Sequence, residues 1–240
     1  MGTPLLAERH AHTTWSDGVL TPAELVDLYG GEGFDVLYIT DHTLRTGTVG
    51  SAAAPPRSID AENYCAYLTQ IEREAERAKA QYGLLLLPGL ELTDNDPDPD
   101  LAAHALAIGL HRYVSVDDGI EAALIAAGRL GAALVAARPH DTEGSSNPGR
   151  LTRRFARERE RLGPLVHRYE LFNRLQLFRW VSDANLPHIA TGDFHRMEHL
   201  PGWKTYLPCE LNEAAVVAHL RSAAPVYLAR RDAQGRSLAA

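Results

Sequence analysis

The sequence RHAHTTWSDG, at residues 9–18, follows a short apolar segment at residues 5–7. If this segment begins a β-strand, His10 and His12 point to the same face, because side chains alternate with a period of two along a strand. Two imidazoles about 7 Å apart on one strand face can bind the same metal ion. Asp17 follows after a bend that the flanking serine and glycine favour. The alternative interpretation of this stretch alone is an ordinary edge strand with two surface histidines.

The composition is that of a soluble globular protein. The length fits one α/β domain spanning residues 1–240, and a content of 45% hydrophobic and 23% charged residues is ordinary for such a domain. The formal net charge of −7 indicates no general affinity for nucleic acids or anionic membranes. We find no apolar run of membrane-spanning length, no signal-peptide pattern and no disulfide framework in the two cysteines. These features predict a cytoplasmic protein.

Apolar runs and helical patterns alternate about seven times along the chain. The expected strands are residues 5–7, 36–40, 84–87, 103–109, 132–137, 169–173 and 188–193. The expected helices are residues 21–29, 60–82, 115–129, 151–162, 174–184 and 212–223, and a last strand at 226–229 precedes a tail at 234–240. Thr21 and Glu24 form a capping box at the first helix, and a loop at about residues 43–58 has a length typical of functional loops. This alternation predicts a parallel sheet, and so many units favour a closed TIM-like barrel over an open sheet.

Histidines and carboxylates recur at the ends of the expected strands. They are His10, His12, His42, Glu91, His140, Asp193 and His195, with His104 inside its strand and Asp17 in the opening stretch. In a closed barrel the carboxyl ends of the strands meet at one mouth. So many buried polar groups would cost about 1–3 kcal/mol each without partners, and metal ions are the simplest partners. Imidazole with carboxylate selects Zn, Mn or Fe, and nine ligands suffice for two or three divalent ions.

The arrangement resembles the PHP family, named for polymerase and histidinol phosphatase. The resemblance is carried by the motifs HAHT and SDG in residues 10–18, TDH at 40–42, GLE at 89–91, His104, PH at 139–140, ELFN at 170–173 and GDFH at 192–195. It implies a distorted barrel of seven β/α units, a (β/α)7 TIM-like barrel, in which residues 195–240 add a C-terminal helix, strand and tail. It also implies three metal sites, formed by His10, His12, Glu91 and Asp193, by Glu91, His104 and His140, and by Asp17, His42 and His195.

The same resemblance implies a reaction. A metal-bound hydroxide in a di- or trinuclear site would hydrolyse a phosphate ester, with catalytic roles for Asp17, His42, Asp193 and His195. Many family members have a histidine where Asp17 stands, so the third site here is not all-imidazole. Cations near the strand ends could bind the substrate phosphate, and the candidates are Arg138, Arg174, Arg196 and Lys204.

The expected substrate is a small phosphorylated molecule, most simply a phosphomonoester. A 3′–5′ exonuclease or nucleic-acid phosphodiesterase is the alternative enzyme, and an inactive metal-binding scaffold is the non-catalytic alternative. The arginine-rich segment at residues 150–161 is diluted by glutamates and is typical of a solvated helix face, so nucleic acid is not the expected partner. The sequence does not predict an oligomeric state or a membrane partner.

Overall fold

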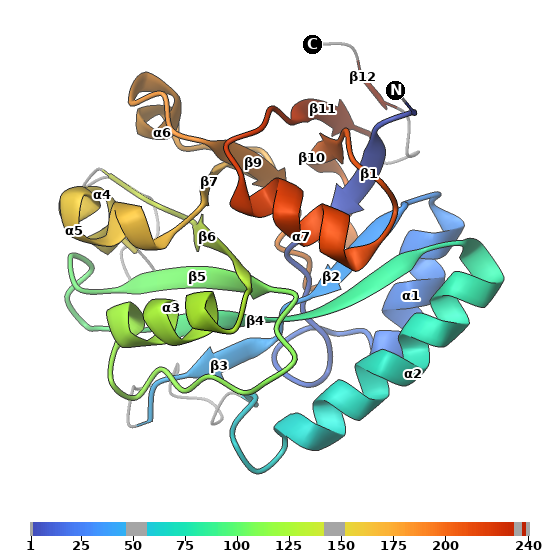
Figure 1. Ribbon diagram of the computed structural model, residues 1–240, viewed down its shortest axis with the longest axis horizontal. Helices are drawn as coiled ribbons and strands as arrows, with labels where there is room; N and C mark the ends of the chain where they lie inside the picture. Colours follow the sequence, from blue (N-terminus) through green and yellow to red (C-terminus); the bar gives the residue numbers. More distant parts are fainter. Residues whose placement is uncertain (1, 47–56, 142–151, 233–236, 239–240) are drawn as a thin grey trace.

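A computed structural model describes residues 2–46, 57–141, 152–232 and 237–238 of the chain. Its strands form a mixed sheet that curls into a half-barrel, and helices lie against it (Figure 1). The order of the main strands is β12-β11-β10-β1-β2-β4-β5-β6-β7-β8, while β3 pairs with β4 and β9 with β7. None of the described helices is long and apolar enough to cross a membrane.

The first half of the chain builds one side of the sheet. Its elements are β1 (Leu5–Glu8), α1 (Pro22–Gly31), β2 (Val36–Ile39), β3 (His42–Leu44), α2 (Tyr64–Tyr82), β4 (Leu85–Asp94) and β5 (Ala103–Ile108). The capping box predicted at α1 is confirmed: the Glu24 backbone amide donates to Thr21 Oγ1 at 3.3 Å, and the Thr21 amide donates to Glu24 Oε2 at 2.8 Å. Helices α1 and α2 pack beside each other on the outer side of β2 and β4 (Figure 1).

The second half completes the sheet. Its helices are α3 (Ile120–Arg129), α4 (Arg154–Arg157), α5 (Arg159–Leu162), η2 (Gly163–Leu165), α6 (Arg179–Asp183), η3 (Met197–His199) and α7 (Glu213–Arg221). Its strands are β6 (Ala133–Ala137), β7 (Arg168–Asn173), β8 (Gln176–Leu177), β9 (His188–Thr191), β10 (Gly202–Leu207), β11 (Tyr227–Arg231) and β12 (Ser237–Leu238).

The α/β class is confirmed, whereas the sheet is mixed and not the parallel sheet of the predicted (β/α)7 TIM-like barrel. Strand β5 runs antiparallel to both β4 and β6, and β10 runs antiparallel to β1. The reason lies in the connection between β4 and β5, because residues 95–102 contain no helix that could carry the chain back to the other end of the sheet. A short link of this kind joins antiparallel strands, while parallel strands need a crossover.

Several element boundaries also differ from the predictions. Strand β3 falls at the start of the predicted 43–58 loop, of which residues 47–56 lie outside the described residues. The predicted helix at 151–162 is two short turns, the one at 174–184 begins only at Arg179 after the small strand β8, and the predicted tail contains β12. Strand β10 was not predicted, because a lysine at its centre breaks the apolar pattern.

Both faces of the central strands are buried, and this decides where the site forms. Val36 and Tyr38 of β2 belong to a core inside the curve, which α7 covers, whereas Leu37 and Ile39 pack outward under the helices. In β5, Leu106 and Ile108 face the inner core, and His104 has the same parity along the strand. Polar residues at inner positions near one end of these strands therefore gather inside the half-barrel.

Candidate metal centre

Four predicted ligands meet from three strands, two of them just after β1, one within β4 and one just after β9. The segment after β1 lies beside the segment after β9, joined by hydrogen bonds from the His12 amide to Phe194 O (2.8 Å) and from the Phe194 amide to His10 O (2.9 Å). Glu91 Oε2 of β4 lies 3.2 Å from His10 Nε2 and 3.3 Å from His12 Nε2. Asp193 Oδ1 lies 3.4 and 3.5 Å from the same two nitrogens. The structure thus brings together the whole first ligand set.

This group fits a metal ion. His10 Nε2, His12 Nε2 and Glu91 Oε2 are buried, and each has no hydrogen-bond partner. The ligand atoms of these three residues all lie within 4.8 Å of one another. Buried polar atoms are rarely left unpaired, since each costs roughly 1–3 kcal/mol. Two imidazoles and a carboxylate converging on one point are a donor set that Zn or a similar ion satisfies.

A second group lies next to the first and is more open to solvent. Asp17 Oδ1 lies 3.5 Å from His42 Nε2, 3.2 Å from His195 Nε2 and 3.7 Å from His12 Nδ1. The Asp17 side chain is 44% exposed, which leaves room for water or a substrate on that side. The structure thus also brings together the predicted ligand set of Asp17, His42 and His195, and these three with His12 form a second candidate metal-binding group.

The bend that carries Asp17 is held by Asp41, whose role was not predicted. Asp41 Oδ1 accepts hydrogen bonds from the Thr13 amide (2.8 Å) and Ser16 Oγ (2.5 Å). Gly18 packs so closely that a Cβ there would overlap the backbone carbonyl of His12. The SDG sequence is therefore required by geometry, since the serine anchors the bend, the aspartate faces the histidines and the glycine permits the close approach.

Glu170 contacts the first group through the Nδ1 atom of His10, and this role was not predicted from the sequence. Its Oε1 lies 2.9 Å from His10 Nδ1 and accepts a hydrogen bond from Thr191 Oγ1 at 2.6 Å. A carboxylate on Nδ1 orients the ring and leaves Nε2 to face a metal ion. Its motif ELFN was part of the family resemblance, so the signal was present without an assigned role.

The electrostatics of the first group are coupled: burial would lower the pKa of His10, but Asp193 and Glu91 raise it well above its usual value, so an ion would displace a proton there. Burial lowers the pKa of His12 to about 3, and the neighbouring His42 ring adds to this effect. Its imidazole is therefore neutral at pH 7, which is the form that binds metals. Burial alone would raise the pKa of Glu91 and of Asp193, but the nearby histidines, His10 among them, hold both pKa values well below their usual range. Two ionised carboxylates in a buried site attract a cation.

His104 and His140, which were predicted to form a separate site with Glu91, belong to neither group. His104 Nδ1 lies 2.9 Å from Glu91 Oε1 and 2.8 Å from Arg138 Nη2, and its Nε2 lies 2.8 Å from Asn95 Oδ1. Both of its ring nitrogens therefore have protein neighbours. His140 Nε2 lies 3.1 Å from the side-chain nitrogen of Gln176, and its ring packs against Phe178.

Comparison with known structures identifies the architecture. The chain is similar to a two-domain protein from Bacteroides vulgatus that contains a predicted PHP-like metal-dependent phosphoesterase, with a TM-score of 0.66 and 21% sequence identity over 95% of this chain and 64% of that one. This chain shares the PHP-like fold. Because it covers 64% of the Bacteroides protein, this chain spans less than two thirds of the length of that protein. A protein from Bifidobacterium adolescentis, proposed to be a metal-dependent phosphoesterase, gives a TM-score of 0.45 at 18% identity over 81% of this chain and 90% of that one. Neither a family model nor a curated protein sequence matches the chain.

Two of the four predicted substrate cations border the metal centre of this PHP-like fold. Arg174 Nη2 donates to Asp193 Oδ2 at 2.8 Å, and its side chain is 35% exposed. The partly buried Arg138 guanidinium lies against His104. Arg138, Arg174 and Asp193 have φ angles of 44°, 54° and 44°, and they follow β6, β7 and β9 directly or within two residues. A left-handed backbone costs a non-glycine residue about 1–2 kcal/mol, and such strain clusters at functional sites.

The other two predicted cations lie elsewhere. Arg196 is 64% exposed and pairs with Glu198 at 3.6 Å. Lys204 is fully buried, and its Nζ donates to Glu8 Oε2 at 2.6 Å. This position gives Lys204 no path to a phosphate group, and its charge instead compensates the buried carboxylate of Glu8.

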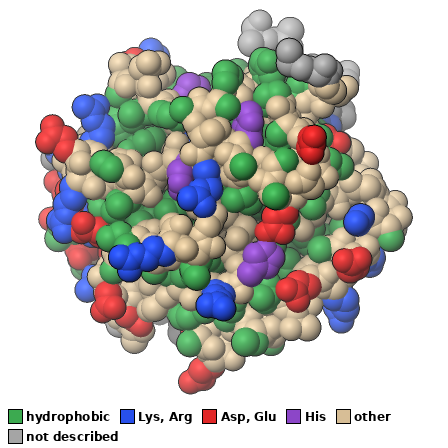
Figure 2. All heavy atoms as spheres, in the orientation of Figure 1, with side chains coloured by type: hydrophobic (Ala, Val, Ile, Leu, Met, Phe, Trp, Pro, Cys, Tyr) green, Lys and Arg blue, Asp and Glu red, His purple; other side chains and the backbone are tan. Residues whose placement is uncertain are grey.

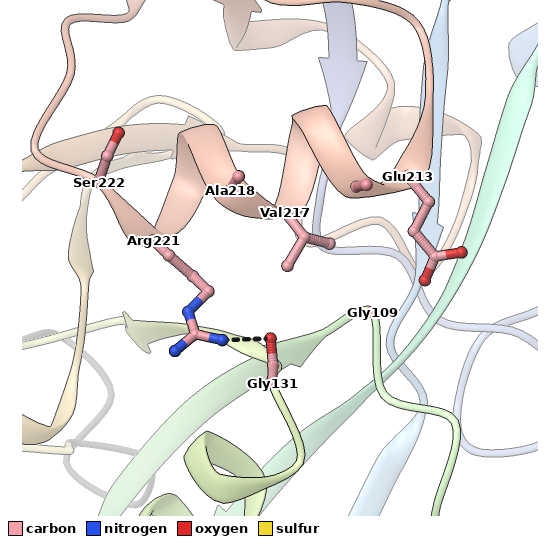
Figure 3. A pocket seen from close by; sticks show the side chains of 8 residues that line it. Gly109, Gly131, Glu213, Val217, Ala218, Arg221 and Ser222 are labelled. Carbon is pink, nitrogen blue, oxygen red and sulfur yellow. Dashed lines mark hydrogen bonds between the residues drawn. The ribbon is translucent and has the colours of Figure 1, made fainter.

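A large surface hollow of about 810 Å³ lies away from the metal centre, against α7 (Figure 3). It is lined by Gly109 after β5 and Gly131 before β6, whereas His104 and Arg138 occupy the opposite ends of these strands. Arg221 points across the hollow and donates to Gly131 O at 2.9 Å. The hollow therefore lies at the other end of the PHP-like sheet from the metal ligands.

Proposed function

We propose that the chain is a metal-dependent phosphoesterase that hydrolyses small phosphomonoesters and uses two divalent ions, Zn, Mn or Fe. The observation that carries this proposal is the convergence of His10 Nε2, His12 Nε2 and Glu91 Oε2, three buried atoms without a hydrogen-bond partner. The PHP-like fold supports it, since the similar Bacteroides protein is named for the same predicted activity.

Each group of ligands has its own role in this proposal. His10, His12, Glu91 and Asp193 hold the buried ion, and Asp17, His42 and His195 hold the more exposed one. Divalent ions bound at such groups polarise a phosphoryl oxygen and lower the pKa of a coordinated water. A third ion at His104 and His140 would require Arg138 to leave the His104 ring, so two ions fit the observed contacts better than three.

The chain itself supplies orientation and charge. Glu170 and Thr93 fix the rings of His10 and His42 through contacts of 2.9 and 2.8 Å at their Nδ1 atoms. Arg174 reaches the edge of the centre with one nitrogen on Asp193, and its planar guanidinium is suited to a phosphate group.

Among the residues that the structure describes, no specific contact favours the nuclease alternative. Of the arginines in α4 and α5 and just before them, Arg153 pairs with Asp100 at 2.6 Å and Arg154 with Glu158 at 3.0 Å. Arg161 contacts Glu121. On the face shown in Figure 2, positive and negative side chains are interspersed and form no continuous basic track. A protein that follows a nucleic-acid backbone needs such a track.

The test is metal analysis followed by a substrate panel. Protein purified without chelators should contain about two divalent ions per chain by plasma mass spectrometry. After chelation and reloading with Mn or Zn, it should hydrolyse nitrophenyl phosphate, mononucleotides or sugar phosphates, and it should leave a nitrophenyl diester and single-stranded DNA nearly untouched. Activity that survives complete chelation would contradict the proposal, and preferential cleavage of DNA would favour the nuclease alternative.

A pair of variants localises the activity. Glu91→Gln keeps the shape of the side chain but removes the negative charge between His10 and His12, so metal content and activity should both fall, the latter at least about 100-fold. Glu62→Gln, an exposed position before α2, is the matched control and should retain both. Equal activity in the two variants would place the reaction elsewhere in the chain.

A further inference from the structure

Arg9 is a buried charge without a partner. Its side chain is fully buried, and its Nε, Nη1 and Nη2 atoms all lack a hydrogen-bond partner. A guanidinium stays protonated at neutral pH and can only donate hydrogen bonds. An isolated buried charge costs several kcal/mol even after relaxation, so natural proteins pair such groups. The interior near Arg9 must therefore hold something that accepts hydrogen bonds and offsets a positive charge.

In the pairing of β1 with β2, Glu8 lies opposite Leu37, so Arg9, the next residue after β1, lies beside Tyr38. The Tyr38 hydroxyl is also fully buried and also without a hydrogen-bond partner, and the other neighbours of Arg9 include the thiol of Cys209. Glu8, the nearest carboxylate in sequence, is bound to Lys204 through Oε2 and to the Arg9 and Gly192 amides through Oε1. The Glu8 charge is thus already matched by the lysine.

A second arginine nearby makes the excess of positive charge larger. Arg168 is an electrostatic neighbour of Arg9, and it disperses its own charge over backbone carbonyls at the end of α7. It donates to Leu220 O at 3.1 Å, to Ser222 O at 2.8 Å and to Ala224 O at 2.6 Å. These carbonyls are neutral, so they add no negative charge that could offset Arg9. Two arginines therefore lie in this part of the inner core, while Glu8 is paired with Lys204, and Glu213, near Tyr38, lies 2.6 Å from His111 Nε2.

We propose that Arg9 and Tyr38 enclose a binding site for a small monovalent anion of the size of chloride, inside the half-barrel and separate from the metal centre. An anion accepts hydrogen bonds from the guanidinium and the phenol together, and it neutralises the unmatched charge, which water alone would not do. Full burial of both side chains excludes larger anions. The site is independent of the proposed hydrolysis.

Thermal unfolding of the full-length, metal-loaded protein tests the site. Melting temperatures are measured at constant ionic strength while chloride replaces gluconate, an anion too large to enter. A ligand that binds only the folded state stabilises it by mass action, and we expect the melting temperature to rise by about 3 °C or more. Arg9→Met should abolish this chloride-specific rise, whereas Arg112→Met, which removes an exposed arginine, should leave it unchanged. Comparison with this control removes general salt effects.

Two further measurements keep the outcome decisive. If Arg9→Met does not fold, Tyr38→Phe keeps the charge and deletes one donor, and it should reduce the chloride-specific rise. Crystals grown in bromide should show an anomalous peak within about 3.5 Å of the Arg9 guanidinium. An identical chloride response in wild type and both inner-core variants, or bromide crystals without a peak at Arg9, would overturn the proposal in favour of ordered water.

Discussion

Lys204 allows a sharp test, because the sequence and the structure give it different roles. The sequence suggested a substrate cation, whereas the structure buries Lys204 completely and places its Nζ 2.6 Å from Glu8 Oε2. In Lys204→Met the side chain keeps its approximate length and loses its charge. The Glu8 carboxylate then remains buried with hydrogen bonds from backbone amides but without a counter-charge.

The magnitude follows from the geometry. Removing one partner of a fully buried ion pair costs about 3–5 kcal/mol, because the other charge remains uncompensated. For a chain of this length, each kcal/mol lowers the melting temperature by roughly 2–4 °C, so we expect a fall of roughly 6–20 °C. Lys79→Met, at an exposed position of α2, should change it by less than about 2 °C.

The assay separates the two roles of Lys204. Urea unfolding gives the stability, and the hydrolysis of a phosphomonoester gives KM and kcat well below the melting temperature. We expect lower stability with a nearly unchanged KM, and the double variant Glu8→Gln with Lys204→Met should be more stable than the sum of the single changes predicts. A raised KM together with unchanged stability would refute the structural interpretation and restore the role as a substrate cation.

The remaining predictions concern local geometry near the site. Gly192→Ala should destabilise the protein by about 1–3 kcal/mol in urea unfolding, because the added Cβ would overlap the Glu8 carboxylate. Arg174→Gly should be more stable than Arg174→Ala by about 1 kcal/mol, because φ there is 54°, while both lower kcat/KM by roughly 10–100-fold; equal stability would show that this backbone is unstrained. Thr21→Ala should lower the melting temperature by roughly 2–4 °C through loss of the α1 cap, with activity unchanged.

The sequence predicted most of the side chains that the structure brings together in the two candidate groups, for a physical reason. His10 and His12 lie two residues apart just beyond the end of β1, and not on the strand as predicted, while Glu91 lies within β4 and Asp193 just after β9. Their spacing and their closeness to these strands are local properties that survive whatever the sheet topology is. The strand directions are not local, so the antiparallel β5 was missed even though its residues were assigned to a strand. Lys204 was misread for a related reason, since its partner Glu8 is distant in sequence.

His140 shows a further limit of sequence reasoning. The residue follows the end of β6 closely, which suggested that its ring reaches the centre. Arg138, however, adopts a left-handed conformation, and Trp180 Nε1 holds the next carbonyl, Pro139 O, at 2.6 Å. The chain thus turns in a left-handed conformation directly after β6, and the His140 ring packs against Phe178. Distance along the sequence from a strand end cannot report such a turn, because a single backbone angle decides it.

Glu170 explains how separate strand ends become one centre. Besides its contacts with His10 and Thr191, its Oε2 accepts hydrogen bonds from the Arg138 amide at 2.8 Å and from Asn173 Nδ2 at 3.0 Å. One buried carboxylate thus links the ends of β6, β7 and β9 to the segment after β1. The left-handed backbone of Arg138 presents its amide to this carboxylate, so the hydrogen bond offsets part of the strain at that residue. The side chains that would hold the ions are consequently positioned by hydrogen bonds of the chain itself, and under the proposed function such preorganised groups would serve catalysis.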